Sequence, residues 1–155
     1  MCMPKPRAEH AFLQRLVGRW RVSGEEIPGN ADWIEEVRSL NGIWFVAECR
    51  GSMPDGSDVT AMLTLGHNGA TGRYVGSWIG TMMEHMWVYD GELSADEGTL
   101  CLYTTGPSCT DAPGMQAYRE EMSFSDDDHR RFVSSMKQPD GSWKQFMRAD
   151  YLRIT

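Results

Sequence analysis

The stretch that decides the fold is Leu13-Gln14-Arg15-Leu16-Val17-Gly18-Arg19-Trp20. Its first half completes an amphipathic pattern from Ala8 to Val17, in which apolar residues recur at one-turn spacing, so one short helix is predicted there. The helix stops at Gly18 and leads into a strand on which Trp20 faces away from its charged neighbours. This Gly-x-Trp arrangement predicts a small β-barrel, closed at one end by the helix and filled there by the indole of Trp20.

After Trp20 the apolar pattern changes to a period of two residues, and turn-forming sequences interrupt it at regular intervals. Gly, Asn and Asp adopt the positive φ that tight hairpins need, and Pro presets the first turn residue. The intervals hold about ten strand candidates of roughly 6 to 10 residues. We therefore predict an all-β chain, folded as a single antiparallel up-and-down β-barrel. The predicted turns are Pro28-Gly29-Asn30, Asn41-Gly42, Pro54-Asp55-Gly56, Asn68-Gly69, Asp90-Gly91, Asp96-Glu97-Gly98, Asp126-Asp127-Asp128 and Pro139-Asp140-Gly141.

The length of 155 residues predicts one domain. We expect residues 1–7 to form an extended lead-in, because Pro4 and Pro6 disfavour a helix there, and residues 8–155 to form the barrel domain. An immunoglobulin-type sandwich is the structural alternative. It lacks support, because the Cys and Trp arrangement of that fold is absent and nothing in it calls for an opening helix.

The net charge of −7 argues against nucleic-acid binding, which depends on clustered Lys and Arg. The basic pair Arg130-Arg131 directly follows the acidic turn 126–128, so we expect its field to be largely cancelled. No apolar run approaches the roughly 18 residues that span a bilayer, and no membrane contact is expected. Because no apolar segment follows the basic N-terminus, we expect a cytoplasmic location.

Four cysteines, Cys2, Cys49, Cys101 and Cys109, occur without a Cys-x-x-Cys pair or a histidine at metal-ligand spacing. We therefore predict reduced thiols and no metal site. Motifs for nucleophilic catalysis and for phosphate binding are also absent, so the sequence predicts no cofactor.

Glycine and aromatic residues alternate on two successive strand candidates between Gly72 and Tyr89. Glycines leave space on the face that they share with the aromatic side chains, and apolar sites with a few polar groups are typical of ligand pockets. We therefore predict that the barrel interior binds a small, mainly apolar molecule, the alternative being that the same side chains simply fill a small barrel. The predicted ligand-binding residues are Trp78, Met82, His85, Trp87 and Tyr118.

An enzymatic alternative rests on Glu48 and His85. If both point into the barrel, they provide a general acid and base for an isomerase, cyclase or hydrolase, and the charge of Glu48 gains the partner that burial requires. Most glutamates on strands face solvent, so ligand binding without catalysis is favoured. Tyr118, Arg119 and Glu120 are further polar residues considered for inward positions.

The last strand candidate, from Trp143 to Arg153, must pair with the first if the barrel closes. This pairing brings Arg148 or Arg153 near Trp20, where a guanidinium stacks on the indole. We therefore assign structural roles to both arginines and to Gly18 and Trp20.

A protein-interaction or homodimerisation module is the third function considered. In that case the interior is filled, and an exposed aromatic face around Trp33 or Trp143 contacts a partner or a second copy of the chain.

The short helix, Gly18-Arg19-Trp20, about ten meandering strands and a late arginine together resemble the calycin superfamily of lipocalins and fatty-acid-binding proteins. More extensive matching occurs in residues 9–20, 73–80, 82–91, 126–130 and 134–136. In these segments the chain is similar to a bacterial family known as domain of unknown function 1579. The resemblance covers nearly the whole chain and implies a calycin-like barrel over residues 8–155, with no established activity.

Nitrobindin-type haem barrels also begin with a helix and Gly-x-Trp, and they ligate haem through a histidine close to the C-terminus. Here the segment from Trp143 to Thr155 contains no histidine, and His129 lies next to the acidic turn. Haem binding is therefore not predicted.

Overall fold

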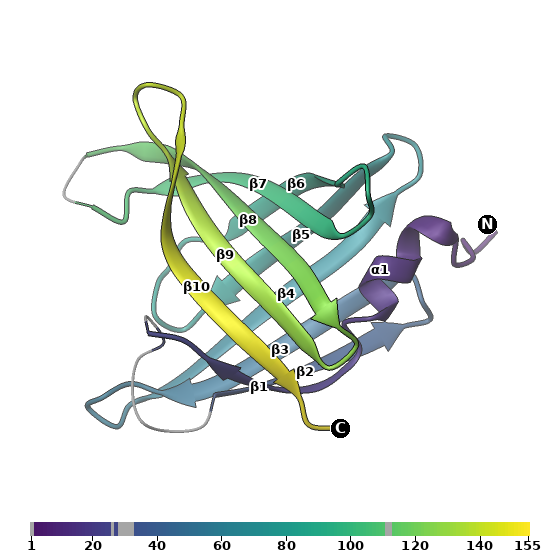
Figure 1. The fold of residues 1–155 in the computed structure, drawn as a ribbon, viewed down its shortest axis with the longest axis horizontal. Coiled ribbons are helices and arrows are strands. Elements are labelled where there is room, and N and C mark those ends of the chain that lie inside the picture. Colours follow the sequence, from purple (N-terminus) through teal and green to yellow (C-terminus); the bar gives the residue numbers. More distant parts are fainter. Residues whose placement is uncertain (1, 26, 28–32, 111–112) are drawn as a thin grey trace.

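A computed structural model describes residues 2–25, 27, 33–110 and 113–155. Within these residues, ten antiparallel strands form one closed barrel, in which each strand pairs with its sequence neighbours and β10 closes on β1 (Figure 1). The predicted up-and-down barrel is confirmed. The strands are β1 (Gly18–Ser23), β2 (Trp33–Leu40), β3 (Trp44–Ser52), β4 (Asp58–Asn68), β5 (Arg73–Gly80), β6 (Trp87–Leu93), β7 (Thr99–Pro107), β8 (Met115–Asp126), β9 (His129–Lys137) and β10 (Trp143–Arg153).

The helical segment at the N-terminus is a 3-10 turn, η1 (Ala8–His10), that continues into α1 (Ala11–Gln14). It lies across one end of the barrel (Figure 1). Its apolar side chains Phe12 and Leu13 are buried there, and the ring centroid of Phe12 lies 5.4 Å from that of Phe124 on β8. We call this the closed end and the opposite one the open end.

The turns follow the predicted sequences, with one exception. Asn41 and Gly42 adopt the positive φ values of 54° and 73° that a tight β2–β3 connection requires. Asp90-Gly91 was wrongly predicted as a turn, because both residues lie within β6. A Cβ at Gly91 would collide with the carbonyl of Cys101, so this glycine permits close approach of β6 and β7. The predicted turn Pro28-Gly29-Asn30 lies outside the described residues.

Trp20 fills the core at the closed end. Its side chain is fully buried, and its Nε1 donates a hydrogen bond of 2.8 Å to the carbonyl oxygen of Leu16. The guanidinium carbons of Arg153 and Arg130 lie over the indole, 4.2 Å and 4.5 Å from the ring centroid. Arg148, the other arginine considered for this contact, instead donates a hydrogen bond to Asp150 on the outer face of β10.

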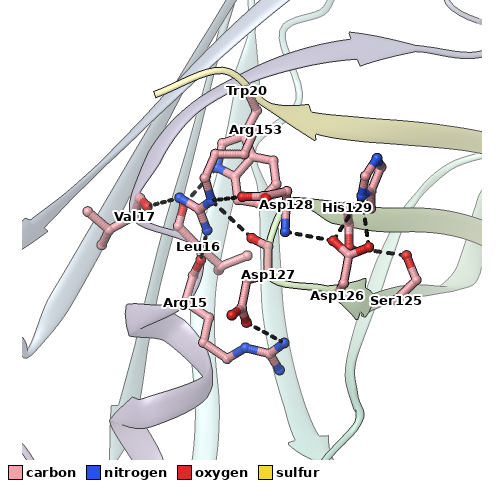
Figure 2. Close-up of polar contacts among 10 residues, drawn as sticks. All are labelled: Arg15, Leu16, Val17, Trp20, Ser125, Asp126, Asp127, Asp128, His129 and Arg153. Atoms are coloured by element: carbon pink, nitrogen blue, oxygen red, sulfur yellow. Dashed lines mark hydrogen bonds and ion pairs between the residues drawn. The ribbon is translucent and has the colours of Figure 1, made fainter.

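Arg153 joins three separate segments at the closed end (Figure 2). Its guanidinium donates hydrogen bonds to the carbonyl oxygens of Val17, at 2.6 Å, Arg15, at 2.8 Å, and Asp127, at 3.0 Å. Gly18 makes room for this guanidinium, because a Cβ there would collide with it, and its φ of 138° also disfavours other residues. The helix end, the start of β1 and the β8–β9 turn are thus held by one side chain.

Replacing Trp20 by Ala removes this buried indole and both of its arginine contacts. We expect the free energy of unfolding, measured by urea denaturation, to fall by about 3–5 kcal/mol, as for other buried aromatic truncations. Trp44→Ala is the matched control, since Trp44 is 46% exposed on β3, and it should cost less. Equal losses in the two variants would contradict the role of Trp20 as the core of the closed end.

Candidate functional site

The barrel wall is interrupted between β6 and β7 on the side of the open end. The pairing of these strands stops at Asp90 and Tyr103. Each strand nevertheless continues, since β6 stays paired with β5 as far as Trp87 and β7 stays paired with β8 as far as Pro107. The ends of both strands are therefore held by their outer neighbours and not by each other.

A groove of about 730 Å³ lies at this interruption and is open to solvent. We call it the β6–β7 groove. Its volume falls within the range of roughly 300 to 1,000 Å³ that is typical of small-molecule sites. Its lining is mostly apolar and aromatic, with one cationic side chain, and consists of His85, Met86, Val88, Tyr103, Thr104, Thr105, Ala117, Tyr118, Lys137 and Trp143.

Two polar atoms in the lining of the groove are buried without a hydrogen-bond partner among the described residues. They are Nε2 of His85 and Oγ1 of Thr104. Thr104 is 8% exposed and occupies an inward position on β7. An unpaired buried polar atom costs about 1–3 kcal/mol of stability. A ligand that brings a hydrogen-bonding group into the groove would reduce this cost.

Edge-to-face aromatic contacts connect the groove to the interior. The ring centroid of Trp87 lies 4.8 Å from that of His85 and 5.2 Å from that of Tyr118, and Tyr118 in turn lies 5.8 Å from Phe146. Trp78 is the register partner of Trp87 on β5. Four of the five residues that we predicted to bind ligand thus lie near one another, of which His85 and Tyr118 line the groove and the two tryptophans do not.

Met82, the fifth predicted residue, lies elsewhere. It lines a separate concavity of about 530 Å³ beside the β3–β4 connection, together with Met53 and Thr81. Its side chain is 45% exposed. Met82 therefore belongs to the rim of the open end and not to the lining of the β6–β7 groove.

Two inward glycines near the open end, Gly80 and Gly106, lie against tryptophan rings. A Cβ on Gly106 would collide with the indole of Trp87, and one on Gly80 would collide with that of Trp78. The cavity near the closed end that borders Glu35 has a volume of about 10 Å³, enough for about one water molecule. At Gly80, one of the glycines that we expected to open space, an indole thus occupies that space. The concavities of ligand size lie at the open end and, with about 610 Å³, on the outer face of β1 to β3.

Glu48 and His85 do not form the acid and base pair that we considered. Glu48 lies on the outer face of β3, where it accepts a hydrogen bond of 2.6 Å from Arg50 and lines a surface concavity with Glu36. His85 lies in the β5–β6 connection and lines the β6–β7 groove. Strand alternation explains the outward position of Glu48, because its neighbour Ala47 is buried in the core.

The two tryptophans considered for a partner contact differ in exposure. Trp33 is 7% exposed and packs in a small core cluster with Val22 and Val59, so it offers no exposed face. Trp143 lies at the groove, where its ring centroid is 6.2 Å from that of Tyr103 and 4.9 Å from the guanidinium carbon of Arg119.

Sequence reasoning missed a buried ion pair. Arg130 on β9 donates a hydrogen bond to the carboxylate of Glu35 on β2, and both side chains are buried. Arg131 faces outward and pairs with Asp150, so the two arginines of this sequence pair have different surroundings. The alternation of inward and outward residues along β9 could have revealed the buried position of Arg130, because Arg130 and the apolar Phe132 share one face of the strand.

A second glutamate is buried in the open half of the barrel. Glu120 is 7% exposed and takes an inward position on β8, as Tyr118 does, whereas Arg119 faces outward. Its carboxyl accepts a hydrogen bond from the hydroxyl of Ser134 on β9. Burial raises the pKa of Glu120 from 4.5 to about 7, and the bond from Ser134 offsets only part of that rise.

Replacing Glu120 by Gln removes this titration. The pKa of Glu120 is higher in the folded than in the unfolded chain. Relative to Glu120→Gln, the wild type is therefore most stable below pH 4.5, and it loses stability as the pH rises to about 7. We expect the unfolding free energy of Glu120→Gln, relative to wild type, to increase across that window by about 3 kcal/mol and then to level off. Urea denaturation at pH 4 to 9 measures it.

Glu36→Gln is the control for this experiment, because Glu36 is a glutamate on the outer face of β2. It should show no comparable increase. A difference between Glu120→Gln and wild type that does not change with pH would contradict the raised pKa.

The acidic turn between β8 and β9 is organised by its own contacts (Figure 2). Asp126 contacts Nδ1 of His129 at 2.8 Å and accepts a hydrogen bond of 2.8 Å from the backbone of Asp128, and Asp127 pairs with Arg15 at 3.7 Å. In the described part of the chain, no group of three or more His, Cys, Asp or Glu side chains is arranged to hold a metal ion. Among the same residues, no helix has the length and apolar character needed to cross a membrane.

Comparison with known proteins identifies the family. Residues 5–153 match the family described as protein of unknown function (DUF1579). A search of curated proteins found no match. The matched residues include the N-terminal helix, every described strand and the full lining of the β6–β7 groove. The chain therefore belongs to the DUF1579 family.

Proposed function

We propose that this protein binds a small, mainly apolar molecule in the β6–β7 groove at the open end of its barrel. The main observation in support is the pair of buried, unpartnered atoms in the lining, Nε2 of His85 and Oγ1 of Thr104. The groove also has a suitable volume and aromatic walls. The ligand therefore combines an apolar body with at least one hydrogen-bonding group.

Two further expectations from the sequence, the calycin-like domain and the cytoplasmic location, belong to this proposal. We infer that residues 8–155 form one calycin-like domain, which is supported by the closed barrel and by the contact between Trp20 and Arg153. We also infer a cytoplasmic location, which is supported by the four free cysteines, because thiols stay reduced in that compartment.

A neutral fluorescent probe tests the binding site. N-pentyl dansylamide should bind saturably, with a blue-shifted emission, because the groove offers it an apolar environment. Ala117→Trp, which fills the groove from β8, should weaken binding at least tenfold. Ser123→Trp, on the same outer face of β8 but outside the groove, is the control and should bind as the wild type does. Absence of saturable binding, or equal binding by both variants, would refute the proposal.

The unpartnered hydroxyl gives a second test. Thr104→Val keeps the shape of the side chain and removes Oγ1, so probe affinity should fall about fivefold to tenfold while the free energy of unfolding stays the same or rises. Thr99→Val, at the other end of β7, should leave affinity unchanged. Loss of stability together with unchanged affinity would show that the hydroxyl of Thr104 has a structural role only.

A further inference from the structure

The lining of the β6–β7 groove differs in charge from the chain as a whole. The chain has 22 acidic and 15 basic residues and a net charge of −7. In the groove, Lys137 provides a cationic side chain and His85 a titratable one, and the described residues of the lining include no Asp or Glu. Because salt at about 0.15 M screens charges beyond about 8 Å, a bound molecule senses this lining more than distant acidic side chains. The groove therefore favours an anionic group over a cationic one.

Lys137 lies in the groove without a counter-charge. Its Nζ is 6.0 Å from the ring centroid of Trp143, and among the described residues no carboxylate lies within ion-pair distance of it. Arg119 lies over the same ring, but its charge is matched by Glu121 at 2.9 Å. The ammonium group of Lys137 is therefore available to an anionic group of a ligand.

The position of Lys137 relative to the interruption in the wall sets the extent of the groove. Thr104 on β7 is the register partner of Tyr118 on β8. Tyr118 in turn pairs with Met136 on β9, and Lys137 is the next residue. Since neighbouring strands lie about 4.8 Å apart, the groove extends about 10 Å from Thr104 to the backbone at Lys137. A molecule that fills the groove has one end at the unpartnered atoms of Thr104 and His85 and the other beside Lys137.

The aromatic side chains between these two ends add apolar surface and no negative charge. The ring centroids of Tyr103 and Trp143 lie 6.2 Å apart. Burial is the main factor that raises the pKa values of Tyr103 and Tyr118, so both phenols stay neutral. The body of a ligand that contacts these rings is therefore uncharged.

We propose that the ligand of the β6–β7 groove is an apolar carboxylate, and that its carboxylate group binds Nζ of Lys137; the inference rests on the proposed function. The apolar body lies against Tyr103 and Trp143, and the other end bears the hydrogen-bonding group that faces the interruption. The ammonium group of Lys137 donates hydrogen bonds to the carboxylate oxygens, and no proton is transferred. A cationic molecule of the same shape is disfavoured, because it places a like charge beside Lys137.

Three matched probes test the charge preference. N-pentyl dansylamide is neutral, N-dansyl-6-aminohexanoate adds a carboxylate to the same five-carbon chain, and dansylcadaverine adds a primary amine there. By fluorescence titration at pH 7.5 in about 0.15 M NaCl, wild-type protein should bind the carboxylate probe about threefold to tenfold more tightly than the neutral one. The amine probe should bind more weakly than either. In about 1 M NaCl the preference for the carboxylate should largely disappear, because salt screens the charge of Lys137.

Variants of Lys137 locate the preference. Lys137→Met removes the ammonium group and keeps an apolar stem, so it should bind the carboxylate and neutral probes about equally. Lys137→Arg keeps the charge and should keep the preference. Lys144→Met is the control, because Lys144 on β10 is exposed and is not part of the groove lining, and it should also keep the preference. In all three variants the neutral probe should bind as it does to the wild type.

The outcomes separate the two proposals. If N-pentyl dansylamide binds and the carboxylate probe binds no better, the carboxylate inference is wrong and the groove is still a binding site. The same conclusion follows if the preference survives Lys137→Met or is lost equally in Lys144→Met. If N-pentyl dansylamide does not bind, the proposed function and this inference both fail.

Discussion

The contact of Trp20 with Arg153 and Arg130 is the interaction on which the closed half of the barrel depends. Through its Nε1 the indole holds the segment that follows the helix, and through Arg153 it is joined to the last strand and the β8–β9 turn. Through Arg130 it borders the buried carboxylate of Glu35 on β2. Barrel closure, helix docking and the burial of Glu35 therefore depend on one cluster, in which each polar group has a hydrogen-bond, ion-pair or cation–π partner within the cluster.

The two halves of the interior differ in the partner that they provide for a buried carboxyl group. In the closed half, Glu35 has a cationic partner, and the guanidinium carbon of Arg130 also lies 3.8 Å from the ring centroid of Tyr151. In the other half, Glu120 has a neutral partner, the hydroxyl of Ser134, and the pairing of β6 with β7 ends at Asp90 and Tyr103, nearer to the open end. A buried charge without a counter-charge costs far more than a buried ion pair, so the carboxylate of Glu35 keeps its charge beside Arg130 whereas Glu120 has a raised pKa.

Sequence patterns predicted the barrel well because alternation and turn chemistry are local properties. Gly18, Trp20 and the closing strand were found from spacing alone, and the choice between Arg148 and Arg153 needed only the register of β10 against β1. The site was harder to predict, because its properties depend on pairs that are distant in sequence. Arg130 meets Glu35 across 95 residues, and no local pattern indicates that Glu120 lacks such a partner. The glycine pattern misled for a different reason, since the indole that fills the space at Gly80 comes from Trp78, two residues away on the same strand.

The packing of Trp87 also constrains how a ligand would enter the β6–β7 groove. Trp87 lies against Gly106, and its Nε1 donates a hydrogen bond of 3.1 Å to Sδ of Met83 in the β5–β6 connection. Displacement of this ring would break that hydrogen bond and its edge-to-face contacts with His85 and Tyr118, but no pairing with β7, because the ladder has already ended at Asp90. At Trp87, β6 is paired with β5 alone, so moving the side chain separates no strands from β7. A ligand in the β6–β7 groove would therefore have to displace aromatic side chains, but would not have to separate β6 from β7.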